Sequence, residues 1–252
     1  MRKTALFAIL LGFAVLAMSG CPKQAEPKKE LVILCGSSFP LPMEQLSARF
    51  TDATGIKIVT TIEGSEVFLP QVKAADQGDV LVTHDPFLDL IKEAGKYSDH
   101  VQVGFVAPVL AVQKGNPKGL AKIEDLTQQG LKVGLTDPKY STCGEMVYAL
   151  LEKKGIKEAV LKNVGNRLTQ GHSALGTYLK TGSVDAVIMW NGVANTFKDS
   201  VDIVKTPYEY DVERRVHVIG LNRTKQPESL KKFIEFIRKN APQTFAEYGY
   251  VK

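Results

Sequence analysis

Serine residues follow two of the apolar runs in this sequence, at points where a helix is expected to begin. Ser37 and Ser38 come after the run LVILCG, and Ser65 comes after KIVTTIEG. A serine hydroxyl is a neutral hydrogen-bond donor, and a helix start adds free backbone N–H groups and the positive end of the helix dipole. Together these groups favour an anion. The alternative is that each serine only caps its own helix.

Two more loops place small or donor-bearing residues in comparable positions. The segment PKYSTCG, which contains Cys143, follows the run KVGLTD and precedes a helical pattern, and Trp190 ends the run DAVIMW. Lys139 is the one lysine or arginine in these four loops. A site made of neutral donors would bind a fully deprotonated anion and reject one that keeps its proton, because that O–H would find no acceptor.

The elements that would position these residues alternate along the chain. Apolar runs typical of strands are LVILCG, KIVTTI, DVLVTH, FVAPVLAV, KVGLTD, DAVIMW and VHVIGL, and helical patterns lie between several of them. Near-continuous apolar strands alternating with helices predict an α/β fold with a mainly parallel sheet covered on both faces. In such sheets, ligands bind beyond the carboxyl ends of the strands, which is where the serines fall.

Two helical segments can be examined in detail. Met43, Leu46 and Phe50 repeat at helical spacing, and Gly55 is placed to end that helix. If a helix starts at Ser65, Pro70 should kink it or delay its start.

The first 30 residues carry targeting signals. Two basic residues precede an apolar run of about 14 residues, which is too short for an ordinary spanning helix and is typical of a signal peptide. The ending AMSGC resembles the lipobox of bacterial lipoproteins, which implies a signal peptide over residues 1–20, a lipid on Cys21 and a charged tether over residues 21–30. The alternative is an ordinary secretory signal that is cleaved nearby.

Composition excludes several classes of function. After residue 30 the chain has 27 Lys and Arg against 25 Asp and Glu, a net charge of +2, which gives no electrostatic surface for nucleic acid. No CxxC pair occurs and there are four histidines, so there is no zinc-ligand spacing. Cys35 and Cys143 could pair in an oxidising compartment, although two cysteines are no disulfide framework.

An ordered set of segments carries a family resemblance. From Leu31 to the C-terminus, CGSSFPLPMEQLSARF, GIKIVTTIEGS, GDVLVTHD, DPKYSTCG and GSVDAVIMWNGVAN are similar to the solute-binding proteins of molybdate and tungstate ABC importers. The resemblance implies a two-lobed periplasmic-binding-protein fold of type II, with lobe one over residues 31–108 and 214–252 and lobe two over 109–213. PVLAVQK and RRVHVIGL would be the crossing strands.

The resemblance also implies a function and a set of partners. The protein would be a monomer outside the cytoplasm, in the periplasm or on the outer face of the cell membrane. It would deliver molybdate or tungstate to a membrane permease with its ATPase, and it would need no cofactor, no resident metal and no catalytic residue. Its implied ligand-binding residues are Ser38, Ser65, Cys143 through its backbone N–H, Gly171 or His172, and Trp190, which stands where the bacterial branch has a tyrosine. Ser37 is a further candidate from its place in the first loop, but we expect Ser38 to be the contact and Ser37 to satisfy local backbone groups.

Two carboxylates lie next to these residues. Glu66 follows Ser65, and Glu145 follows Gly144. A carboxylate that pointed into an oxyanion pocket would repel the ligand. We therefore expect both to face solvent in the first turn of their helices, where a negative charge suits the dipole.

Two other functions stay open. Cys35, His84, Cys143, His172 and Trp190 all fall near strand ends and could bind a soft metal, a thiophilic anion or an aromatic-stacked organic solute. Alternatively, Cys143 at a helix N-terminus could be a nucleophile with His172 as its base. STCG matches no catalytic signature, and no third residue that would orient the base is evident.

Overall fold

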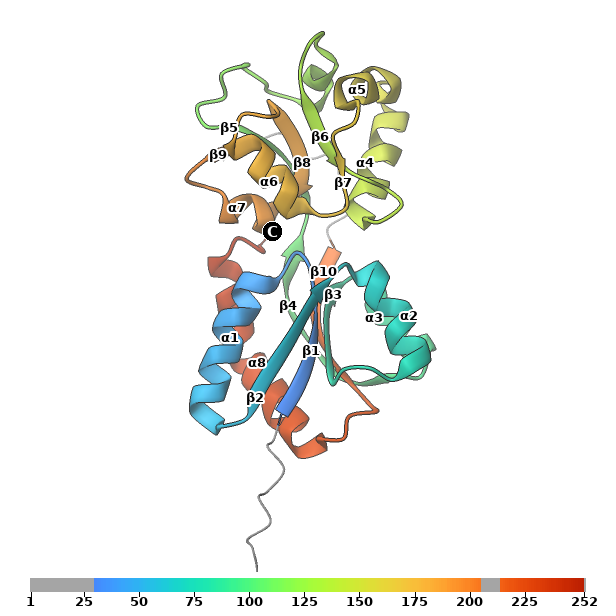
Figure 1. Cartoon of the computed structure of the whole chain (residues 1–252), viewed down its shortest axis with the longest axis vertical. Coiled ribbons are helices and arrows are strands. Elements are labelled where there is room, and N and C mark those ends of the chain that lie inside the picture. Colours follow the sequence, from blue (N-terminus) through green and yellow to red (C-terminus); the bar gives the residue numbers. More distant parts are fainter. Residues whose placement is uncertain (1–29, 205–213, 252) are drawn as a thin grey trace, which may run out of the picture.

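The computed structural model describes residues 30–204 and 214–251. The predicted signal peptide, Cys21 and all of the predicted tether except Glu30 lie outside the described residues. Two five-stranded sheets, each flanked by helices, form two lobes stacked along the long axis of the molecule (Figure 1). No helix in the described ranges is both long and apolar enough to cross a membrane.

Lobe one is built on a sheet with the strand order β2-β1-β3-β10-β4. Its strands are β1 (Glu30–Gly36), β2 (Lys57–Glu63), β3 (Val80–His84), β4 (Tyr97–Val106) and β10 (Arg214–Leu221). β1 pairs in parallel with β2 and β3, whereas β10 is antiparallel to both β3 and β4. Four strands therefore run in one direction and one strand runs against them.

Lobe two repeats this arrangement with the order β7-β6-β8-β5-β9. Its strands are β5 (Pro108–Gln113), β6 (Val133–Thr136), β7 (Leu168–Thr169), β8 (Ala186–Trp190) and β9 (Val201–Ile203). β6 is parallel to β7 and β8, and β5 is antiparallel to β8. The prediction of two α/β lobes with mainly parallel sheets is confirmed, and each sheet is mixed because it includes one reversed strand.

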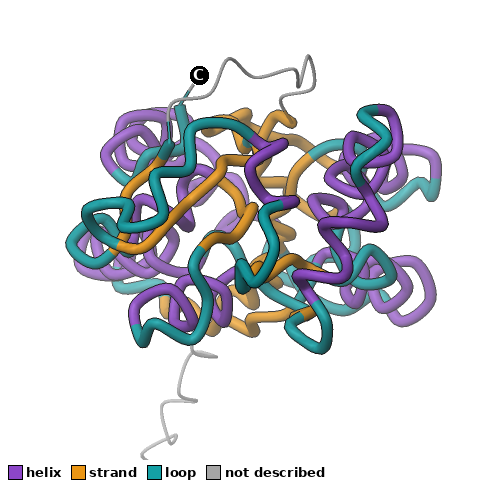
Figure 2. Tube along the Cα trace, turned by 90° about the horizontal axis from the view of Figure 1, so that it is seen from above, coloured by secondary structure: helices purple, strands orange, loops and turns teal. Residues whose placement is uncertain are grey.

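Helices cover both faces of each sheet, as the view from above shows (Figure 2). In lobe one, α1 and α8 pack together on one face, and α2 and α3 pack together on the other. The helices of lobe one are α1 (Pro40–Thr54), α2 (Ser65–Ala75), α3 (Phe87–Glu93) and α8 (Pro227–Glu247). Those of lobe two are the short 3₁₀ helix η1 (Ile123–Thr127), α4 (Thr142–Lys153), α5 (Lys157–Val164), α6 (His172–Lys180) and α7 (Asn191–Thr196).

The apolar strand β1 is buried on both faces. Ile33 and Cys35 belong to the core that includes α1 and α8, whereas Leu34 belongs to the core beneath α2 and α3. A strand covered on both faces has no polar side, which explains its continuous apolar run. The helix predictions agree with this packing: Met43 and Phe50 are buried, and Gly55 ends α1 in the left-handed conformation at φ 69°.

Helix α2 contains Pro70. The helix begins at Ser65 and continues through Pro70 to Ala75, so of the two predicted effects, a kink or a delayed start, the delayed start is wrong. Pro70 is exposed and lies beyond the first turn. Because α2 starts directly after β2, Ser65 is held at the carboxyl end of the sheet.

The lobes are connected where β4 leads into β5 through Ala107. Asn191, the first residue of α7, binds this connection: its N–H donates to the Ala107 carbonyl at 2.9 Å, and its side-chain oxygen accepts from the Ala107 N–H at 3.1 Å. Its side-chain amide also donates to the Val251 carbonyl at 3.1 Å, so the C-terminal end of lobe one lies against α7 (Figure 1). The lobe boundaries at 108/109 and 213/214 stay predictions. Residue 213, at the second boundary, lies outside the described residues.

Candidate ligand-binding site

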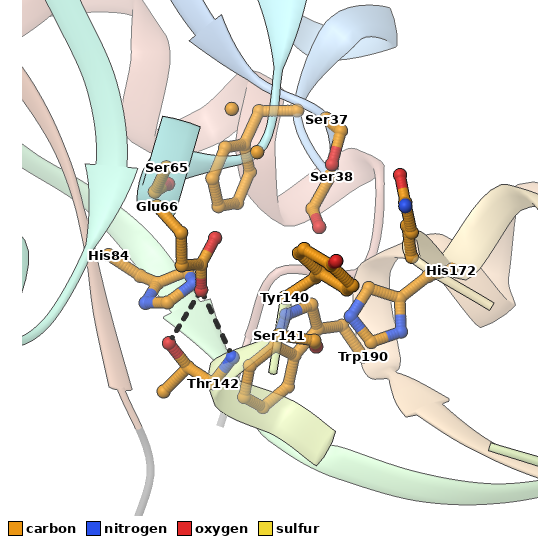
Figure 3. Close-up of a pocket in the computed structure, with 14 residues that line it drawn as sticks. Ser37, Ser38, Ser65, Glu66, His84, Tyr140, Ser141, Thr142, His172 and Trp190 are labelled. Carbon is orange, nitrogen blue, oxygen red and sulfur yellow. Dashed lines mark hydrogen bonds between the residues drawn. The ribbon is translucent and has the colours of Figure 1, made fainter. Parts of the chain in front are cut away.

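A small polar pocket lies between the lobes, beyond the carboxyl ends of both sets of strands (Figure 3). Its volume of about 20 Å³ has room for roughly one water molecule. Six segments line it, three from each lobe, and they include residues of the four loops that the sequence pattern singled out. The lining residues are Gly36, Ser37, Ser38, Phe39, Gly64, Ser65, Glu66, His84, Tyr140, Ser141, Thr142, Gln170, His172 and Trp190.

The serines of lobe one do not cap helices with their side chains. Phe39 is the N-cap of α1 and Gly64 is the N-cap of α2, and neither cap forms a side-chain hydrogen bond. The capping alternative is therefore wrong for Ser38 and Ser65, which are both buried. The Ser65 hydroxyl accepts a hydrogen bond from the Thr83 hydroxyl at 2.8 Å, so its own proton can be donated into the pocket.

The two serines of the first loop have different surroundings. The Ser37 N–H donates to the Glu63 carbonyl at 2.8 Å, which ties this loop to the end of β2. The Ser38 carbonyl accepts a hydrogen bond from the Tyr250 hydroxyl. The Ser38 hydroxyl has no hydrogen-bond partner among the described residues. Its position leaves it available to a ligand.

Lobe two contributes the N-terminus of α4. Ser141 is the N-cap, and its hydroxyl accepts from the Gly144 N–H at 3.3 Å. A side chain at Gly144 would place its Cβ 2.6 Å from the Thr136 carbonyl oxygen, at the end of β6. Gly144 therefore allows the first turn of α4 to approach the sheet, and the N–H of Thr142 points across the pocket.

Three aromatic side chains form the inner wall. Trp190 is only 2 % exposed, and its ring centroid is 5.6 Å from those of both His84 and His172. The His84 ring donates through Nδ1 to the Asp85 carbonyl at 2.7 Å. In the described residues the Nδ1 atom of His172 is buried without a hydrogen-bond partner.

Both histidines are neutral in this wall. Burial lowers the pKa of His84, and burial together with the nearby His84 lowers the pKa of His172 to about 3. No lysine or arginine is present among the described residues that line the pocket. The polar donors of the pocket are therefore uncharged.

Glu66 lies in the pocket, so the prediction that it faces solvent is wrong. Its carboxylate oxygen Oε1 accepts from the Thr142 N–H at 3.1 Å and from the Thr142 hydroxyl at 3.0 Å (Figure 3). These two hydrogen bonds join α2 of lobe one to α4 of lobe two. Glu145 is exposed in the first turn of α4, as predicted. The physical reason for the difference is that the α4 N-terminus, which favours an anion, faces Glu66 across the cleft.

Comparison with known proteins identifies the family. The family model described as bacterial extracellular solute-binding protein matches residues 31–251. The chain belongs to this family. It is 22% identical to a binding protein of Haemophilus influenzae over 88% of this chain and 91% of that one, and 22% identical to the molybdate-binding protein ModA of Mycobacterium bovis over 83% and 79%.

Solved structures agree on the fold of this solute-binding protein. The periplasmic molybdate-binding protein of Azotobacter vinelandii superposes with a TM-score of 0.70 at 15% identity, over 88% of this chain and 99% of that one. The sulfate-binding protein SubI of Mycobacterium tuberculosis superposes with a TM-score of 0.70 at 16% identity, over 88% of this chain and 86% of that one. Iron-bound HitA of Pseudomonas aeruginosa superposes with a TM-score of 0.67 at 18% identity, over 86% of this chain and 84% of that one. The fold therefore accommodates several ligands, and the type II architecture is confirmed.

Two of the predicted site residues are not among those that line the pocket. Cys143 is fully buried behind Thr142, and Gly171 is the N-cap of α6 beside His172. Ser37, Ser38, Ser65, His172 and Trp190 do line it. The neighbours Thr142 and Gln170 were not predicted, although each stands next to a residue that was.

The cysteine-based alternatives find little support in this solute-binding protein. Cys35 and Cys143 are both free and buried, so they form no disulfide in the structure. Burial raises the pKa of Cys35 to about 12 and that of Cys143 well above its usual range, which disfavours the thiolate that a nucleophile requires. The described residues bring together no group of three His, Cys, Asp or Glu placed to hold a metal ion.

Proposed function

We propose that this solute-binding protein captures a tetrahedral oxyanion, molybdate or tungstate, between its two lobes and delivers it to an ABC permease with its ATPase. The observation that carries the proposal is the pocket itself. Hydroxyl groups of Ser38 and Ser65 face the N-terminus of α4 across the cleft, and no cationic side chain lines the space among the described residues. Such a set of neutral donors suits a dianion that carries no proton.

The mechanism we propose is closure of the lobes around the ligand. Ser37, Ser38 and Ser65 would bind the anion from lobe one, and the loops before α4 and α6 would donate from lobe two through the segments around Cys143, Gly171 and His172. A ligand that contacts both lobes stabilises the closed state by its differential affinity for that state. Trp190 would supply a wall of the site. The similarity to ModA supports molybdate, and the two metals form oxyanions of nearly the same size.

The proposal extends to where the protein works. A lipid on Cys21 would anchor a monomer to the outer face of the membrane or within the periplasm, and residues 21–30 would act as the tether. The lipobox-like ending AMSGC supports this anchor. Mass spectrometry of the protein purified from bacterial membranes tests it, because a diacylglyceryl cysteine at residue 21 has a mass that an unmodified chain lacks.

A second candidate is a small organic solute with a hydrogen-bond donor of its own. The observation that favours it is Glu66, an acceptor beside the aromatic side chains of Phe39, His84 and Trp190. Such a ligand would keep the carboxylate in the site as its partner. An oxyanion without protons would not.

Calorimetric titration decides between these candidates. The full chain, purified in a mild detergent, is titrated in turn with molybdate, tungstate, sulfate and phosphate. We expect one-to-one binding of molybdate and tungstate and no heat of binding from sulfate or phosphate. Silence of all four anions would contradict the oxyanion proposal and leave the organic solute as the candidate.

A further inference from the structure

The Glu66 carboxylate occupies hydrogen-bond donors that an anionic ligand would need. Oε1 takes both the backbone N–H and the hydroxyl of Thr142, the first residue of α4. With these donors in use, the remaining pocket of about 20 Å³ has room for roughly one water molecule, which is less than an oxyanion with four oxygens requires. The closed cleft thus already contains an anion, and that anion belongs to the protein.

We infer that Glu66 is an affinity-determining residue, which acts as an internal competitor that an anionic ligand must displace from Thr142. This inference rests on the proposed function, because it concerns anions that enter the same site. The surroundings of Glu66 allow the displacement. Its side chain is half-buried at the edge of the pocket, and it lies in the first turn of α2, where the helix dipole favours a carboxylate that turns outward.

Competition of this kind has a thermodynamic consequence. Ligand can bind only to the molecules in which Glu66 has left the Thr142 donors. The apparent affinity is therefore the intrinsic affinity multiplied by the fraction of such molecules. Repulsion between the carboxylate and an incoming dianion lowers the affinity in the same direction. The same factor applies to every dianion, so Glu66 lowers all of their affinities alike, and an anion that binds weakly falls below measurable binding first.

The same contact joins the two lobes directly. The Glu66–Thr142 contact runs from α2 to α4 at the pocket that Trp190 also lines, and Trp190 is 2 % exposed. Trp190 is the one tryptophan in the 252-residue chain. Its fluorescence therefore reports on this cleft alone, and quenching by acrylamide measures how open the cleft is.

The experiment compares the wild type with Glu66→Gln, Glu66→Ala and the control Glu145→Gln, each as the full chain in mild detergent. Glu145 is a matched control because it is also a glutamate in the first turn of a helix beside the cleft, but its side chain is exposed. Without ligand, we expect acrylamide to quench Trp190 severalfold more strongly in Glu66→Ala, less so in Glu66→Gln because glutamine keeps an acceptor oxygen, and to the wild-type extent in the control. With molybdate, we expect Glu66→Gln to bind at least about tenfold more tightly and to gain measurable binding of sulfate.

The outcomes separate this inference from the proposed function. Unchanged quenching in Glu66→Ala, which removes the acceptor, overturns the inference. Weaker molybdate binding by Glu66→Gln also overturns it, because the carboxylate would then belong to the ligand's own contacts. If no variant responds to any oxyanion, the proposed function fails. In that case the quenching without ligand still decides whether the Glu66–Thr142 contact keeps the cleft closed.

Discussion

Replacement of Ser65 by alanine tests the donor role of this hydroxyl and has two separable effects. The Thr83 hydroxyl donates to Ser65 at 2.8 Å, so the Ser65 proton is left for a ligand. Loss of one hydrogen bond to an anion costs about 1.5–3 kcal/mol, which weakens molybdate binding roughly 10- to 150-fold. Thr83 is fully buried, and without its acceptor the free energy of unfolding should fall by about 1–3 kcal/mol.

A double-mutant cycle with Thr83→Val separates the two effects. Valine has nearly the shape of threonine and needs no acceptor, so the double variant Ser65→Ala/Thr83→Val should regain most of the stability that Ser65→Ala loses. It should not regain affinity, because the donor to the ligand is still missing. Calorimetry measures the affinity, and urea unfolding followed by circular dichroism measures the stability. Recovery of affinity in the double variant would refute the assignment of Ser65 as a ligand donor.

Three further predictions follow from the same geometry. Ser38→Ala should weaken molybdate binding about tenfold or more in calorimetry and Ser37→Ala should weaken it less, because Ser37 is the more exposed of the two; equal losses would contradict the choice of Ser38. Burial lowers the pKa of His172 to about 3 in the folded protein, whereas the unfolded chain has a histidine pKa of about 6.5. Between these two pH values the unfolded chain is protonated at His172 and the folded chain is not. The free energy of unfolding should therefore fall as the pH drops from about 6.5 toward 3, by up to about 1.4 kcal/mol per pH unit. Urea unfolding across that pH range should show that the free energy of unfolding of His172→Asn falls less steeply with falling pH than that of the wild type. An equally steep fall in both proteins would refute the assignment of this pH dependence to His172. Cys143 should resist iodoacetamide in the native protein and react in urea, because burial raises the pKa of its thiol; rapid native labelling would revive the nucleophile reading.

Local patterns predicted most of the fold because they report on burial. The run LVILCG is apolar throughout since β1 is covered on both faces, and the spacing of Met43, Leu46 and Phe50 matches the buried side of α1. Strand β4 was predicted only at its end. Its first four residues are half-buried or exposed at the edge of the sheet, so they carry no continuous apolar signal.

The site was predicted only in part because it depends on how the lobes face each other. Ser38, Ser65 and Trp190 were predicted because they stand at the ends of apolar runs, and strand ends meet at one edge of a sheet, whereas His172 was predicted from the family resemblance. All four line the pocket. The inward direction of Glu66 has no local signal, since the first turn of α2 would accept a carboxylate facing solvent equally well. What decides its direction is Thr142, which is 76 residues away in the chain.

Some residues that line the cleft are chain neighbours of residues that connect the lobes, and others are hydrogen-bonded to them. Trp190 lines the pocket, and the next residue, Asn191, holds the connection at Ala107 through two hydrogen bonds. On the other side, the Ser38 carbonyl accepts from Tyr250, whose ring packs so closely against Gly192 that a Cβ there would come within 2.2 Å of it. If the lobes close around a ligand as proposed, a ligand that contacts Ser38 and Trp190 would act next to the segments that connect the lobes. Binding and closure would then be coupled through residues that are adjacent in the chain.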